Sequence, residues 1–169
     1  MKENNADVGL AAGQTGGDAA AVALLGFESG TRHWLVDLSD AGEVVPVPTL
    51  SPVPLTKPWF RGIANVRGTL YGVSDFAAFH GEEMTLLKTQ SRLLLAGARA
   101  GSAQGGNIAL LMSATQGLKV LSRMESLSAT GSVGEPWRGA SYRDSEGCVW
   151  TRLIIPALLT TPSFLDITA

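Results

Sequence analysis

Short apolar segments separated by glycine-containing turns run through most of this chain, and they limit its fold class more than any other feature. Residues 33–38 mix apolar and polar side chains in rough alternation, as a half-buried strand does. Two further pairs of strand-length segments flank turn-forming connections: 91–98 with 107–112, and 140–143 with 148–155. About eight to ten short strands at this spacing favour an all-β barrel or sandwich over an alternating α/β fold.

A proline-rich segment interrupts this pattern between Val44 and Pro58, with prolines at positions 46, 48, 52, 54 and 58. Proline has no backbone N–H and a fixed φ, which excludes a helix interior and a central strand. We therefore expect an extended, ordered surface loop. The following residues, 62–75, place apolar side chains around Arg67-Gly68, where glycine supplies the positive φ of a tight turn, and this predicts a hairpin.

The two ends of the chain differ in character from its middle. Residues 1–20 are rich in Gly, Ala, Asn and Asp without apolar periodicity, which predicts a mobile low-complexity tail. Residues 21–169 are long enough for a single domain that contains two β-subdomains. Only the C-terminal part favours helix, because Pro156 suits a first turn and residues 163–166 have the spacing of a capping box.

The charge of the chain argues against polyanionic partners. Its 13 basic and 15 acidic residues give a net charge of -2, so no overall field concentrates nucleic acid or an acidic membrane surface. The apolar run 19–25 follows Asp18 and lacks the basic lead of a signal peptide, and no stretch has the roughly 20 apolar residues that span a bilayer. We expect a cytoplasmic protein without nucleic-acid binding or direct membrane insertion.

The sequence contains none of the common catalytic or cofactor motifs. It has no Gly-x-Ser-x-Gly elbow, no phosphate-binding loop, no His-Glu-x-x-His and no cysteine pair. The two histidines, His33 and His80, lack metal-ligand spacing, and their positions favour a strand surface and a turn over catalysis. Cys148 beside Trp150 is interpreted as a small buried apolar residue. We expect a non-enzymatic protein with no cofactor and no metal.

The segment Lys57–Phe76, KPWFRGIANVRGTLYGVSDF, resembles the signature of CheW-like domains. In that signature a glycine, an Asn-Leu-Arg-Gly turn and a Val-x-Asp-Leu strand recur. The proline loop, the later strands and the ending 162–166 follow in the family's order, so the resemblance covers about residues 24–167. The Lys-Pro-Trp start and the form Ala-Asn-Val-Arg-Gly are most similar to CheW-type adaptors of pilus-linked chemosensory systems, which govern twitching motility.

The resemblance implies a fold and a function. The fold would be two intertwined five-stranded β-barrels with short helices, and the protein would bridge a methyl-accepting chemoreceptor's cytoplasmic tip and a CheA-type histidine kinase without catalysing a reaction. Two departures from the family pattern stand out. Residues 112–115 replace an acidic Val-Asp-Glu-Val stretch, which affects any contact made by that acid, and Gly72 and Ser74 replace bulkier residues, which predicts looser packing.

Arg67 is the main candidate for a partner-binding residue. A guanidinium on an exposed turn can form bidentate hydrogen bonds with a partner's carboxylate, and the resemblance associates the matching arginine with receptor binding. The alternative is a solvated turn charge or a cap on nearby carbonyls. Asn65 is the second candidate, although an amide before a tight turn also holds the turn by local hydrogen bonds. Gly62 and Gly68 are assigned to backbone geometry.

Apolar residues supply the remaining candidates. Val44, Val45 and Leu50 are expected at barrel edges, where they would either contact a partner helix or pack the proline loop. Trp59 and Phe60 are interpreted as core residues, the alternative being an exposed aromatic anchor. Two other functions remain open from the sequence: a small-barrel nucleic-acid binder, and a module that binds a small molecule between the two barrels.

Overall fold

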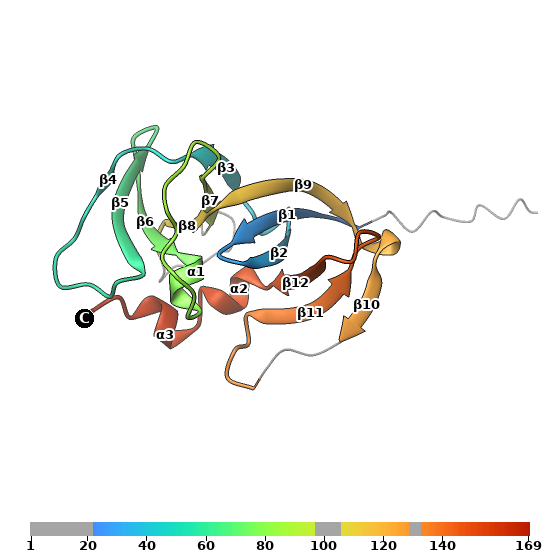
Figure 1. The fold of residues 1–169 in the computed structure, drawn as a ribbon. Helices are drawn as coiled ribbons and strands as arrows, with labels where there is room; N and C mark the ends of the chain where they lie inside the picture. The colour runs from blue at the N-terminus through green and yellow to red at the C-terminus, as the bar shows by residue number, and fades with distance from the viewer. Residues whose placement is uncertain (1–21, 97–105, 129–132) are drawn as a thin grey trace, which may run out of the picture.

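The computed structural model describes residues 22–96, 106–128 and 133–169. The predicted tail of residues 1–20 and most of the glycine-rich connection after residue 96 lie outside this part of the chain. The described residues form twelve β-strands, three one-turn α-helices and one 3-10 turn (Figure 1). The all-β fold class predicted from the sequence is therefore confirmed.

The strands form two sheets of six. The first sheet has the order β10-β11-β12-β2-β1-β9. Its strands are β1 (Ala23–Ser29), β2 (Arg32–Asp37), β9 (Ala114–Val120), β10 (Glu125–Ser128), β11 (Arg138–Arg143) and β12 (Val149–Leu153). The second sheet has the order β3-β7-β8-β6-β5-β4. Its strands are β3 (Glu43–Pro46), β4 (Leu50–Ser51), β5 (Phe60–Val66), β6 (Thr69–Asp75), β7 (Arg92–Ala96) and β8 (Ile108–Met112).

The second sheet is built from one continuous stretch of the chain, which is inserted into the first sheet. Strands β3 to β8 make the second sheet, and the segments before and after them make the first, joined by the parallel pair β12 and β2. The two subdomains are thus intertwined, as the resemblance implies. The implied five-stranded barrels need correction, because each sheet has six strands and no pairing among the described residues joins its two edge strands.

The proline-rich segment contains two short strands, so the expectation of a loop throughout was wrong. Strand β3 ends at Pro46 and pairs only with β7, and β4 pairs only with β5, which places both at the edges of the second sheet. An edge strand tolerates proline because one side of its backbone needs no partner donor. The predicted hairpins β5–β6 and β11–β12 and the pair β7–β8 are confirmed.

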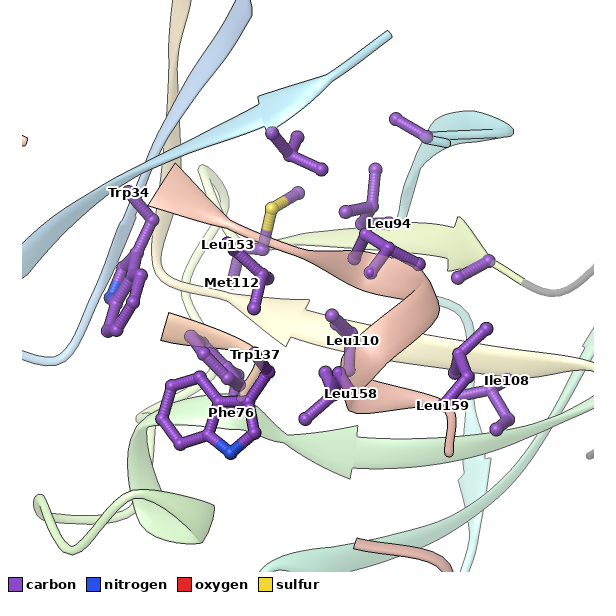
Figure 2. Packing of buried hydrophobic residues seen from close by; sticks show 14 of the residues in the cluster. Trp34, Phe76, Leu94, Ile108, Leu110, Met112, Trp137, Leu153, Leu158 and Leu159 are labelled. Carbon is purple, nitrogen blue, oxygen red and sulfur yellow. The ribbon is translucent and has the colours of Figure 1, made fainter. Parts of the chain in front are cut away.

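Three hydrophobic clusters hold the described residues together. Alternation along β7 places Leu93 and Leu95 in a cluster confined to the second sheet, whereas Leu94 and Ala96 face the first sheet. The cluster between the sheets is the largest, and Figure 2 shows Trp34 and Phe76 on one side of it with Leu94 and Leu110 on the other. Burial on both faces explains why β7 and β8 are continuous apolar runs.

Three one-turn helices cover the space between the sheets. Helix α1 (Phe76–Phe79) was not predicted; its N-terminus is capped by Asp75, whose Oδ1 accepts from the Ala78 N–H at 3.4 Å. Helices α2 (Ile155–Leu158) and α3 (Pro162–Leu165) confirm the short C-terminal helical turns. The capping box at residues 163–166 was wrong, because α3 begins at Pro162 and makes no side-chain cap. No described helix is long and apolar enough to cross a bilayer.

The aromatic residues ahead of the hairpin pack inward. Trp59 is half-buried against the largest cluster and stacks on Phe164 of α3, with ring centroids 5.7 Å apart and planes 9° from parallel. The ring of Phe60 lies over Gly72, where an added Cβ would stand 3.3 Å from it. The space that Gly72 leaves is therefore filled by a neighbouring strand, in contrast to the looser packing expected there.

Candidate functional site

The tip of the β5–β6 hairpin is a two-residue turn whose central residues both have positive φ: 50° at Arg67 and 83° at Gly68. Positive φ at both positions is the geometry of a type I′ turn, which matches the twist of the flanking strands. The Gly68 N–H donates to Oδ1 of Asn65 at 2.8 Å. The structure thus places Asn65 as the side chain that holds the turn.

Arg67 extends from this turn to Glu43, the first residue of β3. Its Nη1 donates to Glu43 Oε1 at 2.9 Å, and its Nη2 donates to Glu43 Oε2, so the pair is bidentate. The hydrogen bonds lower the pKa of Glu43 below its ordinary value and raise the pKa of Arg67, so both groups stay charged at neutral pH. Although paired, the Arg67 side chain remains 67% exposed.

This ion pair also shows that the second sheet is strongly curved. Strands β7 and β8 lie between β3 and the β5–β6 hairpin in the strand order, yet the hairpin tip reaches Glu43. The sheet therefore curls strongly enough to bring its fourth strand back beside its edge. Sequence reasoning missed Glu43, because nothing local to residue 43 indicates that it meets residue 67.

The other predicted site residues occupy different environments. Gly62 has φ of 116°, and a Cβ there would lie 2.2 Å from the Ser51 carbonyl oxygen of β4, so glycine is required for this strand contact. Val45 is buried in the second sheet's core, which corrects its placement as an exposed candidate. Val44 and Leu50 are partly exposed and also pack against clusters, so neither is a free apolar side chain.

A groove of about 690 Å³ lies where the two sheets meet. The β1–β2 turn and the β8–β9 junction form one wall, and the irregular segment 81–90 after α1 forms the other. Ser113 and Ala114, which belong to the stretch 112–115 where the sequence departs from the resemblance, lie in this wall. In the sequence, the one signal for this groove is a group of three apolar residues inside a polar stretch, at positions 84, 86 and 87.

A buried carboxylate fixes one wall of the groove. Asp75 is fully buried and its Oδ2 accepts from Arg61 Nη1 at 3.0 Å and from the Thr85 N–H at 2.7 Å. Its Oδ1 accepts from the Thr85 hydroxyl at 2.9 Å, and Arg61 also donates to the Thr85 carbonyl at 2.9 Å. One acid and one arginine thereby attach the middle of the loop to the start of α1.

The histidines and the cysteine form no reactive grouping. His33 lies 3.6 Å from Glu28 and packs beside Trp150. Cys148 is partly buried against the third hydrophobic cluster, which contains Trp150 with Leu24 and Leu35. His80 is enclosed by Trp34 and Phe76, and burial lowers its pKa below 6.5. Within residues 22–96, 106–128 and 133–169, no three potential metal ligands gather at one point.

Comparison with known proteins connects this geometry to a family. The model for the CheW-like domain matches residues 23–160, which is most of the chain. Protein PilI of Pseudomonas aeruginosa is 37% identical over 71 residues, covering 42% of this chain. The alignment spans 40% of the length of that relative.

A solved structure gives the same fold. The scaffolding protein TtCheW from Thermoanaerobacter tengcongensis superposes with a TM-score of 0.63 at 16% sequence identity, over 79% of this chain and 88% of that one. At this identity the likeness concerns the fold alone. With the family match over residues 23–160, the chain belongs to the CheW-like domain family, whose members are non-catalytic scaffold adaptors.

Proposed function

We propose that this CheW-like adaptor works in the cytoplasm and couples the tip of a methyl-accepting chemoreceptor to a CheA-type histidine kinase. The partial likeness to PilI supports a role in a pilus-linked pathway that controls twitching motility. An adaptor of this kind needs surfaces that bind without large ordering costs, and the buried clusters on both sides of β7 and β8 supply a rigid body.

The exposed Arg67–Glu43 pair at the hairpin tip is the main support for this function. The turn supported by Asn65 and the pairing with Glu43 orient the arginine side chain, and the guanidinium N–H groups that do not donate to Glu43 remain available to a partner at little ordering cost. An exposed pair of this kind contributes little to folding, because water competes for both charges. The geometry of the Arg67–Glu43 pair is therefore better suited to binding a partner than to stabilising the fold.

A charge exchange at this pair separates the two roles. The variants Arg67→Glu, Glu43→Arg and the double exchange are each tested for co-purification with a CheA-type regulatory domain and with a receptor signalling fragment. We expect Arg67→Glu to reduce retention of at least one partner roughly tenfold with little change in melting temperature, and the double exchange to leave retention low. Wild-type retention by Arg67→Glu, or full recovery by the double exchange, would show that the arginine does not dock.

A further inference from the structure

A second hollow, of about 520 Å³, is walled by aromatic side chains from three separate parts of the chain. Trp59 precedes β5, Phe79 ends α1 and Trp137 precedes β11. This aromatic pocket shares only Gly81 with the lining of the groove described above. A hollow of a few hundred Å³ with aromatic walls and a few polar groups is the usual form of a small-molecule site.

The aromatic walls hold one another in place. The rings of Trp59 and Phe79 meet edge to face with centroids 5.3 Å apart, and the ring of Phe79 lies 5.8 Å from that of Trp137. Phe164 of α3 stacks against Trp59 in a nearly parallel plane, which fixes the orientation of the indole. Trp59 and Phe79 nevertheless remain partly exposed. The pocket is therefore formed before a ligand enters, and binding requires little ordering.

The charged side chains of the pocket already have partners. Lys57 Nζ donates to the Asp166 carbonyl oxygen at 2.6 Å and to its carboxylate at 3.3 Å. Glu135 accepts from Arg138 Nε at 2.6 Å. The Arg138 guanidinium also lies 5.3 Å from the centroid of the Trp137 ring, so this ring already has a cation beside it. A charged ligand would compete with these contacts, whereas an uncharged ligand leaves them intact.

The lining also contains polar groups that these ion pairs do not use. Both ring nitrogens of His80 are buried without a hydrogen-bond partner among the described residues. Such atoms are rare in native proteins, because an unpaired polar group away from water costs free energy. A neutral imidazole offers one N–H donor and one acceptor nitrogen. When the ring turns toward the pocket, it can form a hydrogen bond with the edge of a heteroaromatic ligand.

We propose that the aromatic pocket binds an uncharged, planar heteroaromatic molecule, with its ring among Trp59, Phe79 and Trp137 and its polar edge toward His80. Aromatic walls favour a flat ring over an aliphatic one, because stacked and edge-to-face contacts stabilise the complex beyond the burial of area. The site goes beyond the adaptor function, since it requires neither a receptor nor a kinase. It would make the adaptor responsive to a small molecule.

Titration of the purified full chain tests the site. Indole and adenine, two uncharged planar probes, are added to ¹⁵N-labelled protein, and NMR follows the indole N–H signals of its four tryptophans. We expect at least one probe to give saturable shifts at Trp59 and Trp137 with a Kd of about 1 mM or lower, and no shift at Trp150, which lies in a separate cluster.

Three control probes test the ligand class: tetramethylammonium and benzoate are charged, and cyclohexanol is not planar. We expect each to bind at least tenfold more weakly than the better of the two planar probes. Shifts that do not saturate, equal shifts at Trp150 or equal affinity for any control probe would overturn the proposal.

Two variants of α3 place the same ring inside and outside the pocket. Ser163 is exposed and lines the pocket, whereas Leu165 is 43% exposed on the same helix and does not. We expect Ser163→Phe to weaken binding at least tenfold and Leu165→Phe to leave it at the wild-type level, with both variants folded. Equal affinities of the two variants would show that the probes bind elsewhere. Because the titration contains no partner protein, its result is independent of the proposed adaptor function.

Replacement of His80 tests the polar edge. His80→Phe keeps a ring and removes both nitrogens, and we expect it to weaken binding of the planar probe roughly fivefold through the loss of one hydrogen bond. Wild-type affinity in a folded His80→Phe variant would contradict the role of His80 in the site.

Discussion

Asp75 shows how one buried side chain supports a surface some distance along the chain. It is fully buried, caps α1 and accepts hydrogen bonds from Arg61 and Thr85. Removing one partner from such a network leaves the other polar groups without compensation, and this penalty exceeds the net stabilisation that the intact pair provides. The carboxylate is thus required for the local structure even though a buried ion pair by itself adds little to stability.

For Asp75→Asn we expect the free energy of unfolding to fall by about 3 kcal/mol, because Arg61 loses its buried counter-charge. Asp166→Asn is the matched control: Asp166 pairs with Lys57, but its side chain is 63% exposed, and we expect a much smaller change in the free energy of unfolding. Urea unfolding at neutral pH measures both. Equal midpoints for the two variants would contradict the anchoring role of Asp75.

His80 is the residue that should make stability depend on pH near neutrality. Both ring nitrogens are buried without a hydrogen-bond partner among the described residues, and the ring lies among Trp34, Phe76 and Trp137. Burial is the main cause that lowers the pKa of His80 below 6.5, the nearby Arg32 and Arg138 act in the same direction, and Glu82 opposes them. The folded state therefore resists protonation that the unfolded chain accepts.

The sign of the effect follows from this difference in proton uptake. Below about pH 6.5 the unfolded state binds a proton at this position before the folded state does, so stability falls as the pH decreases. His80→Phe keeps an aromatic ring and removes the titration, and we expect it to lose less stability between pH 7.5 and pH 5.5 than the wild type. Parallel denaturation curves for the two proteins over that range would show that His80 is not the cause.

Among the elements, the β4–β5 contact depends on Gly62 for space in addition to its positive φ, whereas the hairpin tip depends on Gly68 for its φ alone. A Cβ at Gly62 would overlap the Ser51 carbonyl, but a Cβ at Gly68 would meet nothing within 4 Å. We expect Gly68→Ala to cost about 1–2 kcal/mol for its left-handed backbone, and Gly62→Ala to cost clearly more. Thermal unfolding of both variants provides the comparison, and a smaller loss for Gly62→Ala would mean that β4 detaches without penalty.

The sequence predicted those elements whose signals are local. The hairpins were found because their turn residues, such as Arg67-Gly68 and Gly147, stand between the strands they join. Helix α1 was missed because one turn ending at Phe79 is too short to show a helical period. Strand β3 was missed because prolines argue against a strand, and only its edge position in the finished sheet makes Pro46 acceptable.

At the scale of the whole molecule, the interleaved chain brings distant residues together in ways that no local pattern predicts. Glu43 meets Arg67 because the second sheet curls, and Thr31 meets Glu82 because the β1–β2 turn of the first sheet lies against the loop after α1. The resemblance to CheW-like domains predicted the all-β fold with two subdomains and the residues of the β5–β6 hairpin. The buried position of Val45, the partner of Arg67 and the groove required the strand order.

The rigid body between these surfaces is the physical basis of the proposed adaptor function. The cluster that contains Trp34, Leu94 and Leu110 joins the two sheets, so the hairpin tip on the second sheet and the groove between the sheets are held in a fixed relation (Figure 2). An adaptor brings its partners together without catalysing a reaction. Its affinity for each partner is higher when the binding surface is already formed before binding.

A reconstitution of the bridge tests this account most directly. A receptor signalling fragment is immobilised, and retention of a CheA-type regulatory domain is measured with and without this protein. We expect the protein to increase kinase-domain retention at least tenfold over the level without it, and Arg67→Glu to remove most of the increase while remaining folded. Equal retention with and without the wild-type protein would contradict the adaptor function.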